Sequence, residues 1–330
     1  MISIRGKNKT AQITEGALVI SIVICTRNRA DSLAHVLETT CKQGLAEFGY
    51  EIIVVDNGSL DHTRQVTETF SQKFSNVRYI LEPRCGLSNA RNRGIREAKG
   101  RYVAYLDDDC RAPANWLVVA GEIIDSVKPA VFGGPYYPFY DSPKPYWWKD
   151  RYGTFEEFSS PRPLRRHEYL RGGNLFIQHK LFETISGFDV DYGMSGRNLA
   201  YGEETELQKR IRAGMPDAII YYDPKLYVYH LVSSEKMSLC WTLRSCFMGG
   251  RCSYHIFEDE ISRKTGVSRL KLHSKFVLTL LRFVANFLVR LFLRDRKQSP
   301  HLQNVFYENT VEYIAKLGRI YEKYKNCQRF

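Results

Sequence analysis

The chain has 330 residues, of which 44% are hydrophobic and 25% charged, so it can fill a core and is not intrinsically disordered. Its net charge of +12 fits a nucleic acid, an anionic membrane or a phosphorylated ligand as partner. Ten basic residues and one acid lie within residues 263–297, so most of the excess is local. The eight cysteines form no C-x-x-C pair, which argues against a structural zinc site.

From residue 18 onward, short apolar runs alternate with segments of helical periodicity. Strands are predicted at 18–25, 51–55, 77–81 and 102–106, and helices at 31–43, 61–74 and 87–98. This alternation predicts an α/β fold with a mostly parallel, Rossmann-like sheet flanked by helices. Three strands end in T-R-N, D-N-G-S and D-D-D. Ligands bind beyond the carboxyl ends of such strands, so we expect the site there.

The amino-acid composition changes after residue 133. Residues 135–163 hold six of the twelve prolines and ten aromatic residues, which predicts an ordered loop rather than a helix. Further on, strands are predicted at 175–178, 218–222 and 225–229 and a helix at 203–213. The predicted organisation is an N-terminal tail (1–16), a main domain (17–255, with halves 17–133 and 134–255) and a basic, amphipathic helical C-terminal region (256–330).

The D-D-D cluster carries the strongest chemical signal. Adjacent carboxylates repel one another unless a cation compensates them, and a hard ion such as Mg²⁺ or Mn²⁺ prefers oxygen ligands. A solvated acidic turn is the plain alternative. Arg91, near the start of a predicted helix, could face phosphates or be an ordinary surface arginine.

An acid pair and a histidine complete the set of chemistry-bearing residues. Glu203 and Glu204 open a predicted helix, where acids often only complement the helix dipole, although one could serve as a general base. His230 closes a predicted strand, and a neutral imidazole is a ligand for Mn²⁺.

Together these segments resemble a known family. The ordered motifs I-C-T-R-N-R, V-V-D-N-G-S, G-L-S-N-A-R-N, A-Y-L-D-D-D, G-G-N, G-E-E-T-E-L and Y-x-H are similar to those of family 2 glycosyltransferases of the GT-A fold, over about residues 18–232. The resemblance implies a metal-dependent inverting enzyme that moves a sugar from a nucleotide diphosphate sugar, most often a UDP-sugar, to a hydroxyl acceptor.

The resemblance also implies roles for individual residues. The nucleotide-sugar residues would be Thr26, Arg27, Asp56, Asn57, Ser59, Arg91, Asp107 and Asp108. Asp107, Asp109 and His230 would hold Mn²⁺ or Mg²⁺, and Glu204 would be the catalytic base, with Glu203 as the alternative. Trp147, Trp148, Gly173 and Asn174 are the acceptor candidates. For the two tryptophans the reason is that aromatic rings pack against sugar or lipid faces, and a loop that simply packs on the core is the alternative.

Three departures from the family pattern refine this expectation. Glu204 stands where an aspartate is usual, and Arg27 stands where an aromatic residue is often found. The segment Q-K-R-I at 208–211 lacks the tryptophan of the Q-x-x-R-W motif of processive synthases. We therefore expect a non-processive enzyme that adds one sugar, in the synthesis of a cell-surface polysaccharide or glycolipid.

The apolar run 276–293 would be about 27 Å long as a helix, close to the thickness of a bilayer core. Thr279, Arg282, Asn286 and Arg290 recur along it at helical spacing and predict a polar, basic stripe. An in-plane helix on an anionic membrane fits this pattern, and packing on the catalytic domain is the alternative. We expect a cytoplasmic protein, peripheral on the inner membrane face.

Two other functional classes fit the sequence less well. A nucleic-acid-binding or membrane-binding protein without catalysis would use the same basic segment, but the aromatic residues lie elsewhere in the chain, so we expect no nucleic acid partner. A nucleotidyltransferase would need a glycine-rich loop after the first strand, and T-R-N-R is not one.

Overall fold

The computed structural model describes residues 18–43, 49–196, 199–258 and 268–327. The predicted tail 1–16, and Arg263 and Lys264 of the basic segment, lie outside these residues. The first half of the chain contains β1 (Leu18–Thr26), α1 (Ala30–Thr40), β2 (Gly49–Asp56), α2 (Thr63–Lys73), β3 (Val77–Leu81), α3 (Leu87–Glu97) and β4 (Tyr102–Leu106). Strands β3, β2, β1 and β4 lie side by side and run parallel, which confirms the predicted sheet.

The next segments complete the main sheet and add a smaller one. They are β5 (Cys110–Arg111), α4 (Trp116–Ser126), β6 (Val131–Gly133), β7 (Tyr136–Phe139), β8 (Arg162–Pro163), β9 (Asn174–Gln178), α5 (Glu203–Gly214), β10 (Ile220–Tyr222) and β11 (Val228–Leu231). The main sheet has the order β3-β2-β1-β4-β9-β6-β10-β8, in which β9 is antiparallel to both its neighbours. Strands β5, β11 and β7 form the second sheet.

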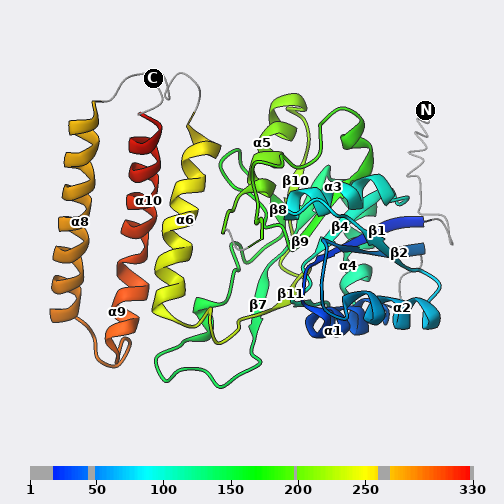
Figure 1. Cartoon of the computed structure of the whole chain (residues 1–330), viewed down its shortest axis with the longest axis horizontal. Coiled ribbons are helices and arrows are strands. Elements are labelled where there is room, and N and C mark those ends of the chain that lie inside the picture. Colours follow the sequence, from blue (N-terminus) through cyan, green and yellow to red (C-terminus); the bar gives the residue numbers. More distant parts are fainter. Residues whose placement is uncertain (1–17, 44–48, 197–198, 259–267, 328–330) are drawn as a thin grey trace, which may run out of the picture.

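Helices cover both faces of the main sheet, as Figure 1 shows. The central strands are therefore buried on both sides and consist of continuous apolar runs, such as Ile52–Val55, in which every residue is fully buried. Large aromatic side chains fill the layer near α4, where the rings of Phe132 and Phe176 stack with centroids 4.5 Å apart. This packing holds the strand ends at fixed positions.

Two local predictions needed correction. The helix predicted from Asp61 begins at Thr63, and Asp61 uses one carboxylate oxygen to accept from the backbone N–H of Ala30, so it also binds the start of α1. The strand predicted at 225–229 instead spans Val228–Leu231, which places His230 inside β11.

The C-terminal helices form a layer beside the α/β part of the molecule (Figure 1). They are α6 (Leu239–Phe257), α8 (Arg269–Phe292), α9 (Leu302–Asn309) and α10 (Val311–Asn326). Helix α10 packs between α6 and α8. Gly250 and Gly318 allow the close approach, because a Cβ at Gly250 would lie 1.9 Å from the Ala315 carbonyl oxygen. The predicted boundary at residues 255/256 falls within the last turn of α6.

The polar stripe predicted on α8 is split by the packing. Asn286 faces inward and donates to the Tyr313 hydroxyl at 3.0 Å, and Thr279 is half-buried, whereas Arg282 and Arg290 are exposed. Within the described residues, none of the helices has the length and hydropathy needed to span a bilayer.

Candidate active site

The site lies where β1, β2 and β4 end, at the edge that the sequence predicts. The small sheet completes it, because His230 on β11 pairs with Cys110 on β5, the residue that directly follows Asp109. The backbone N–H of Leu231 donates to the Asp109 carbonyl at 2.9 Å. A histidine more than 100 positions away in the sequence is thereby fixed beside the acidic cluster.

Asp107, Asp109 and His230 each offer a ligand atom within 4.8 Å of the other two. His230 Nε2 lies 3.4 Å from Asp109 Oδ1. Burial lowers the pKa of His230, so its imidazole is neutral and can bind a metal ion. Two carboxylates and an imidazole match the ligand preferences of Mn²⁺.

Two basic side chains that the sequence did not single out contact the same acids. Arg29 Nη1 lies 2.8 Å from Asp108 Oδ1 and 3.3 Å from Asp109 Oδ2. Lys236 Nζ lies 3.1 Å from Asp109 Oδ2. Burial raises the pKa of Asp109, but the positive groups around it outweigh burial and hold the pKa below its usual value. Asp109 is therefore an ionised carboxylate although it is buried.

Arg91 lies inside the protein. Its side chain is buried, with Nη1 2.6 Å from Glu203 Oε1 and Nη2 3.5 Å from Asp107 Oδ1. The rings of Tyr105 and Phe188 lie 5.7 and 5.3 Å from its guanidinium carbon. Arg91 thus bridges the acidic cluster after β4 and the first residue of α5.

The two glutamates at the start of α5 differ in environment. Glu203 is buried in its ion pair with Arg91, whereas Glu204 is half-buried and has no ion-pair partner among the described residues. Burial, and then repulsion by the neighbouring Glu203 carboxylate, raise the pKa of Glu204 to about 8. A carboxylate with a raised pKa near neutral pH has the basicity that a general base needs.

The G-G-N motif lies behind these groups. A Cβ at Gly172 would lie 2.6 Å from Arg91 Nη2, and a Cβ at Gly173 would lie 2.1 Å from Asp107 Oδ2. Asn174 is buried, and its amide donates to the Leu226 carbonyl at 2.6 Å. The two glycines therefore leave the space that Arg91 and Asp107 occupy, and Asn174 joins β9 to the segment before β11.

The turn after β2 holds the predicted nucleobase residues together. Asp56 accepts from the backbone N–H of Ser59 at 2.8 Å and from the Tyr79 hydroxyl at 2.8 Å. The Ser59 hydroxyl accepts from the backbone N–H of Asn28 at 2.9 Å. Asn28 has φ of +52°, and its side chain accepts from the Leu60 N–H. The ends of β1 and β2 are thus linked into one rigid rim.

Other predicted residues of this rim differ in exposure. Arg27 is exposed and contacts Cys85 Sγ, whereas Thr26 is buried. The Asn57 amide donates to the carbonyls of Glu82 and Arg84 at 3.0 and 2.7 Å. Because that amide also accepts from the Gly86 N–H, Asn57 shapes the loop before α3.

The predicted acceptor residues Trp147 and Trp148 are both buried. They pack with Tyr152 and Tyr307, and the Trp147 carbonyl accepts from the Asn304 amide at 2.6 Å. Their rings therefore attach the aromatic loop to α9, and contact with an acceptor would require this cluster to open.

The sequence model described as glycosyl transferase family 2 matches residues 21–192, slightly more than half of the chain. The chain belongs to this family. Among relatives, glycosyltransferase AglE of Haloferax volcanii is 28% identical over 170 residues, which are 51% of this chain and 55% of AglE. The chain thus matches only about half the length of that relative.

Solved structures share the fold of this family 2 glycosyltransferase. S. aureus TarS 1-349 in complex with UDP-GlcNAc superposes with a TM-score of 0.54 at 15% identity, covering 94% of this chain and 91% of that one. Mannosyltransferase PcManGT from Pyrobaculum calidifontis, in complex with GDP-Man and Mn2+, gives 0.54 at 14% identity and covers 90% and 87%. These likenesses confirm the GT-A type of fold.

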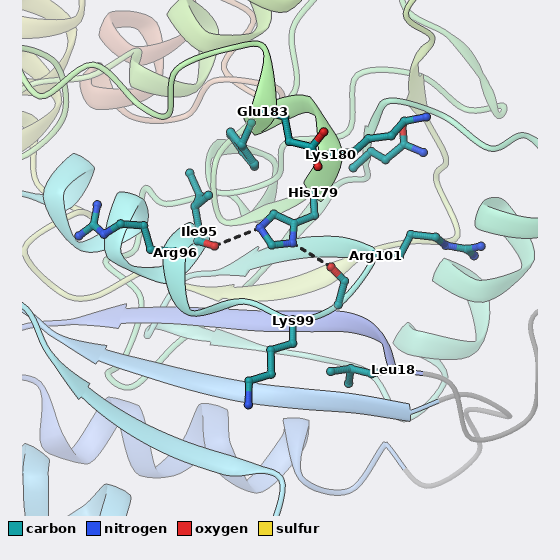
Figure 2. Close-up of a pocket in the computed structure, with 11 residues that line it drawn as sticks. Leu18, Ile95, Arg96, Lys99, Arg101, His179, Lys180 and Glu183 are labelled. Carbon is teal, nitrogen blue, oxygen red and sulfur yellow. Dashed lines mark hydrogen bonds between the residues drawn. The ribbon is translucent and has the colours of Figure 1, made fainter.

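Two of the cavities formed by the described residues bear on the location of the site. One of about 210 Å³ adjoins the acids, with Asp108, Asp109, Arg111 and His35 in its lining. The other, of about 680 Å³, lies at the opposite end of β1 and β4 (Figure 2). There both ring nitrogens of His179 lie 3.1 Å from carbonyl oxygens. The second cavity is remote from the acidic cluster.

Sequence reasoning missed Arg29 and Lys236 of the glycosyltransferase. Arg29 follows the recognisable T-R-N, and its position just before α1 was the available signal. Lys236 lies in an irregular segment after β11, where no pattern links it to Asp109.

Proposed function

We propose that the protein is a metal-dependent, inverting, non-processive glycosyltransferase that moves one sugar from a nucleotide diphosphate sugar to a hydroxyl acceptor. The observation that carries this proposal is the contact of Arg91 with both Asp107 and Glu203. It holds the start of α5, and with it Glu204, next to the acidic cluster. A base and a diphosphate site side by side are what sugar transfer requires.

Asp107, Asp109 and His230 would hold Mn²⁺ or Mg²⁺. The buried Nδ1 of His230 has no hydrogen-bond partner among the described residues, which fits an imidazole that is available for a further ligand. When bound, the ion would neutralise charge on the leaving diphosphate. Arg29 and Lys236 are positioned to supply further positive charge at the same place.

Glu204 is proposed as the base, because Glu203 is occupied by Arg91. The acceptor hydroxyl gives its proton to Glu204, and its oxygen forms a bond to the anomeric carbon. The bond between that carbon and the diphosphate oxygen breaks on the opposite face, and the nucleoside diphosphate leaves with the electron pair. A single displacement inverts the configuration at the anomeric carbon.

A UDP-sugar is the proposed donor, held at the rim formed by Thr26, Arg27, Asp56, Asn57, Ser59 and Asp108. The complex of TarS with UDP-GlcNAc supports a UDP-sugar, whereas the complex of PcManGT with GDP-Man supports a guanine nucleotide. The planar guanidinium of the exposed Arg27 would stack on either base.

The test is a transfer and hydrolysis screen with UDP- and GDP-sugars, with Mn²⁺, with Mg²⁺ and with EDTA. We expect turnover with one nucleotide class and its loss in EDTA. Thermal stabilisation by the matching nucleoside diphosphate and Mn²⁺ should accompany turnover. No turnover and no stabilisation by any nucleotide would contradict the proposal.

The acceptor is proposed to be a growing cell-surface polysaccharide or glycolipid, met at the inner face of a membrane. The support for this location is the basic character of the sequence over 263–297. The described part of that segment includes α8, which lies at one end of the molecule (Figure 1).

A further inference from the structure

Helix α8 is the outermost helix of the C-terminal layer (Figure 1). One side of it packs against α9 and α10, where Phe283 and Phe287 contact the ring of Phe306 and Asn286 bonds to Tyr313. Of its described residues only Leu272 is fully buried. The opposite side has no neighbour within the described part of the chain.

That opposite side is apolar. Its large exposed residues are Leu270, Val277, Leu278, Leu280, Leu281, Val284, Leu288, Val289 and Phe292. Leu281 is 60% exposed and Phe292 is 91% exposed. At 100° per residue the positions from Val277 to Phe292 form one continuous apolar arc, and the exposed His273 and Ser274 lie on the same side between Leu270 and Val277. A contiguous apolar surface of this extent marks an interaction site.

A basic stripe borders the arc. Lys271, Lys275 and Arg282 are separated by four and seven residues, so they lie on one edge of the apolar face. All three are exposed, and the described residues provide no ion-pair partner for them. The face therefore combines apolar side chains with uncompensated positive charge.

We propose that the outer face of α8 docks in the plane of an anionic lipid membrane, with its apolar arc among the acyl chains and Lys271, Lys275 and Arg282 at the headgroups. Such a helix combines apolar burial with attraction to acidic lipids. Two copies paired symmetrically through this face would bring the same three cations toward one another. An anionic lipid surface instead supplies the complementary negative charge.

The packing of α8 against α9 and α10 also determines which side of α8 can face a membrane. Because α9 and α10 cover its inner side, α8 cannot expose that side to lipid without leaving the helical layer. The stripe of Thr279 and Asn286 therefore points away from the membrane. This proposal builds on the membrane location in the proposed function, but vesicle binding can be measured without sugar transfer, so the two can fail separately.

The test is co-flotation of the full chain with vesicles of phosphatidylcholine plus phosphatidylglycerol, or of phosphatidylcholine alone. Binding is expected to the acidic vesicles and to weaken with salt. Neutralising Lys271, Lys275 and Arg282 with glutamine should lower partitioning on the order of a hundred-fold, at about 1 kcal/mol per cation.

A second variant removes the apolar contact. Leu281→Gln, Leu288→Gln and Phe292→Gln together should abolish flotation, and these side chains are exposed enough for folding to persist. Ile219→Gln, at an exposed position on the catalytic part, is the matched control and should float like the parent protein. The proposal would be overturned if the parent protein did not bind acidic vesicles at low salt. It would also be overturned if the Leu281/Leu288/Phe292 variant floated as well as the parent protein. If the parent protein formed a dimer and did not bind vesicles, and the Leu281/Leu288/Phe292 variant were a monomer, the face would bind a second copy of the chain instead.

Discussion

Arg91 and Glu203 form a buried ion pair, with Nη1 and Oε1 2.6 Å apart, between residues 112 positions apart in the sequence. Gly172 leaves the space for the guanidinium, and Asp107 contacts its other terminal nitrogen. The pair assigns different roles to two adjacent glutamates. Glu203 is buried in the ion pair, whereas Glu204 is half-buried and has no ion-pair partner among the described residues.

We predict that Glu204→Gln lowers the transfer rate on the order of 10²- to 10⁴-fold, because the amide cannot take the acceptor proton. Binding of the nucleoside diphosphate should persist, since Glu204 does not contact the acidic cluster in the described structure. Rates and nucleotide titrations of the purified variant measure both effects. A variant with the rate of the parent protein would exclude Glu204 as the base.

Glu203→Gln is expected to act on stability instead. Removing one charge of a buried pair leaves Arg91 partly uncompensated and should lower the free energy of unfolding on the order of 3 kcal/mol. Denaturant titration measures the loss, and Glu204→Gln is the matched comparison. Unchanged stability would show that Asp107 alone compensates Arg91.

The pH dependence follows from the raised pKa of Glu204. A base must be deprotonated, so kcat/KM should rise with pH through about 8. In Glu203→Gln a repelling negative charge is gone, which lowers the pKa of Glu204 and moves this rise to lower pH. Profiles of both proteins, taken where the variant is folded, decide the point. A shift in the opposite direction would contradict the assignment.

Asp109→Asn and His230→Gln should each lose most of the activity and the thermal stabilisation by Mn²⁺ plus nucleoside diphosphate. The reason is that each removes a ligand from the only His/Cys/Asp/Glu cluster in the described residues that could hold a metal ion. Differential scanning fluorimetry with and without Mn²⁺ measures the effect apart from turnover. Retention of the Mn²⁺ effect in both variants would place the ion elsewhere.

Gly173→Ala tests the space behind Asp107. The added Cβ would lie 2.1 Å from Asp107 Oδ2, so the carboxylate must move and Mn²⁺-dependent activity should fall at least ten-fold. Gly249→Ala, in α6, meets no atom within 4 Å and should keep full activity with equal or greater stability. Equal activity of the two variants would show that Asp107 moves without consequence.

Local sequence patterns were sufficient for the four parallel strands β1 to β4 and for the polar residues that follow them. Continuous apolar runs such as 51–55 identify strands buried on both faces, and polar residues directly after them must lie at the carboxyl edge of a parallel sheet. Asp56 and Asp107 directly follow predicted strands. Their position at this edge therefore follows from the order of residues along the chain. The family resemblance then suggested roles for them.

Contacts between distant segments could not be predicted in this way. The pairing of β11 with β5, the burial of Arg91 against Glu203 and the docking of Trp147 on α9 depend on packing between segments separated by more than 100 residues. On α8, the periodic pattern of residues shows two sides but not which side a neighbouring helix covers. The sequence by itself determined the four parallel strands, the polar edge at their ends and the basic segment. Only the tertiary structure decided which glutamate is free and which face of α8 is exposed, because burial depends on neighbours that are remote in the chain.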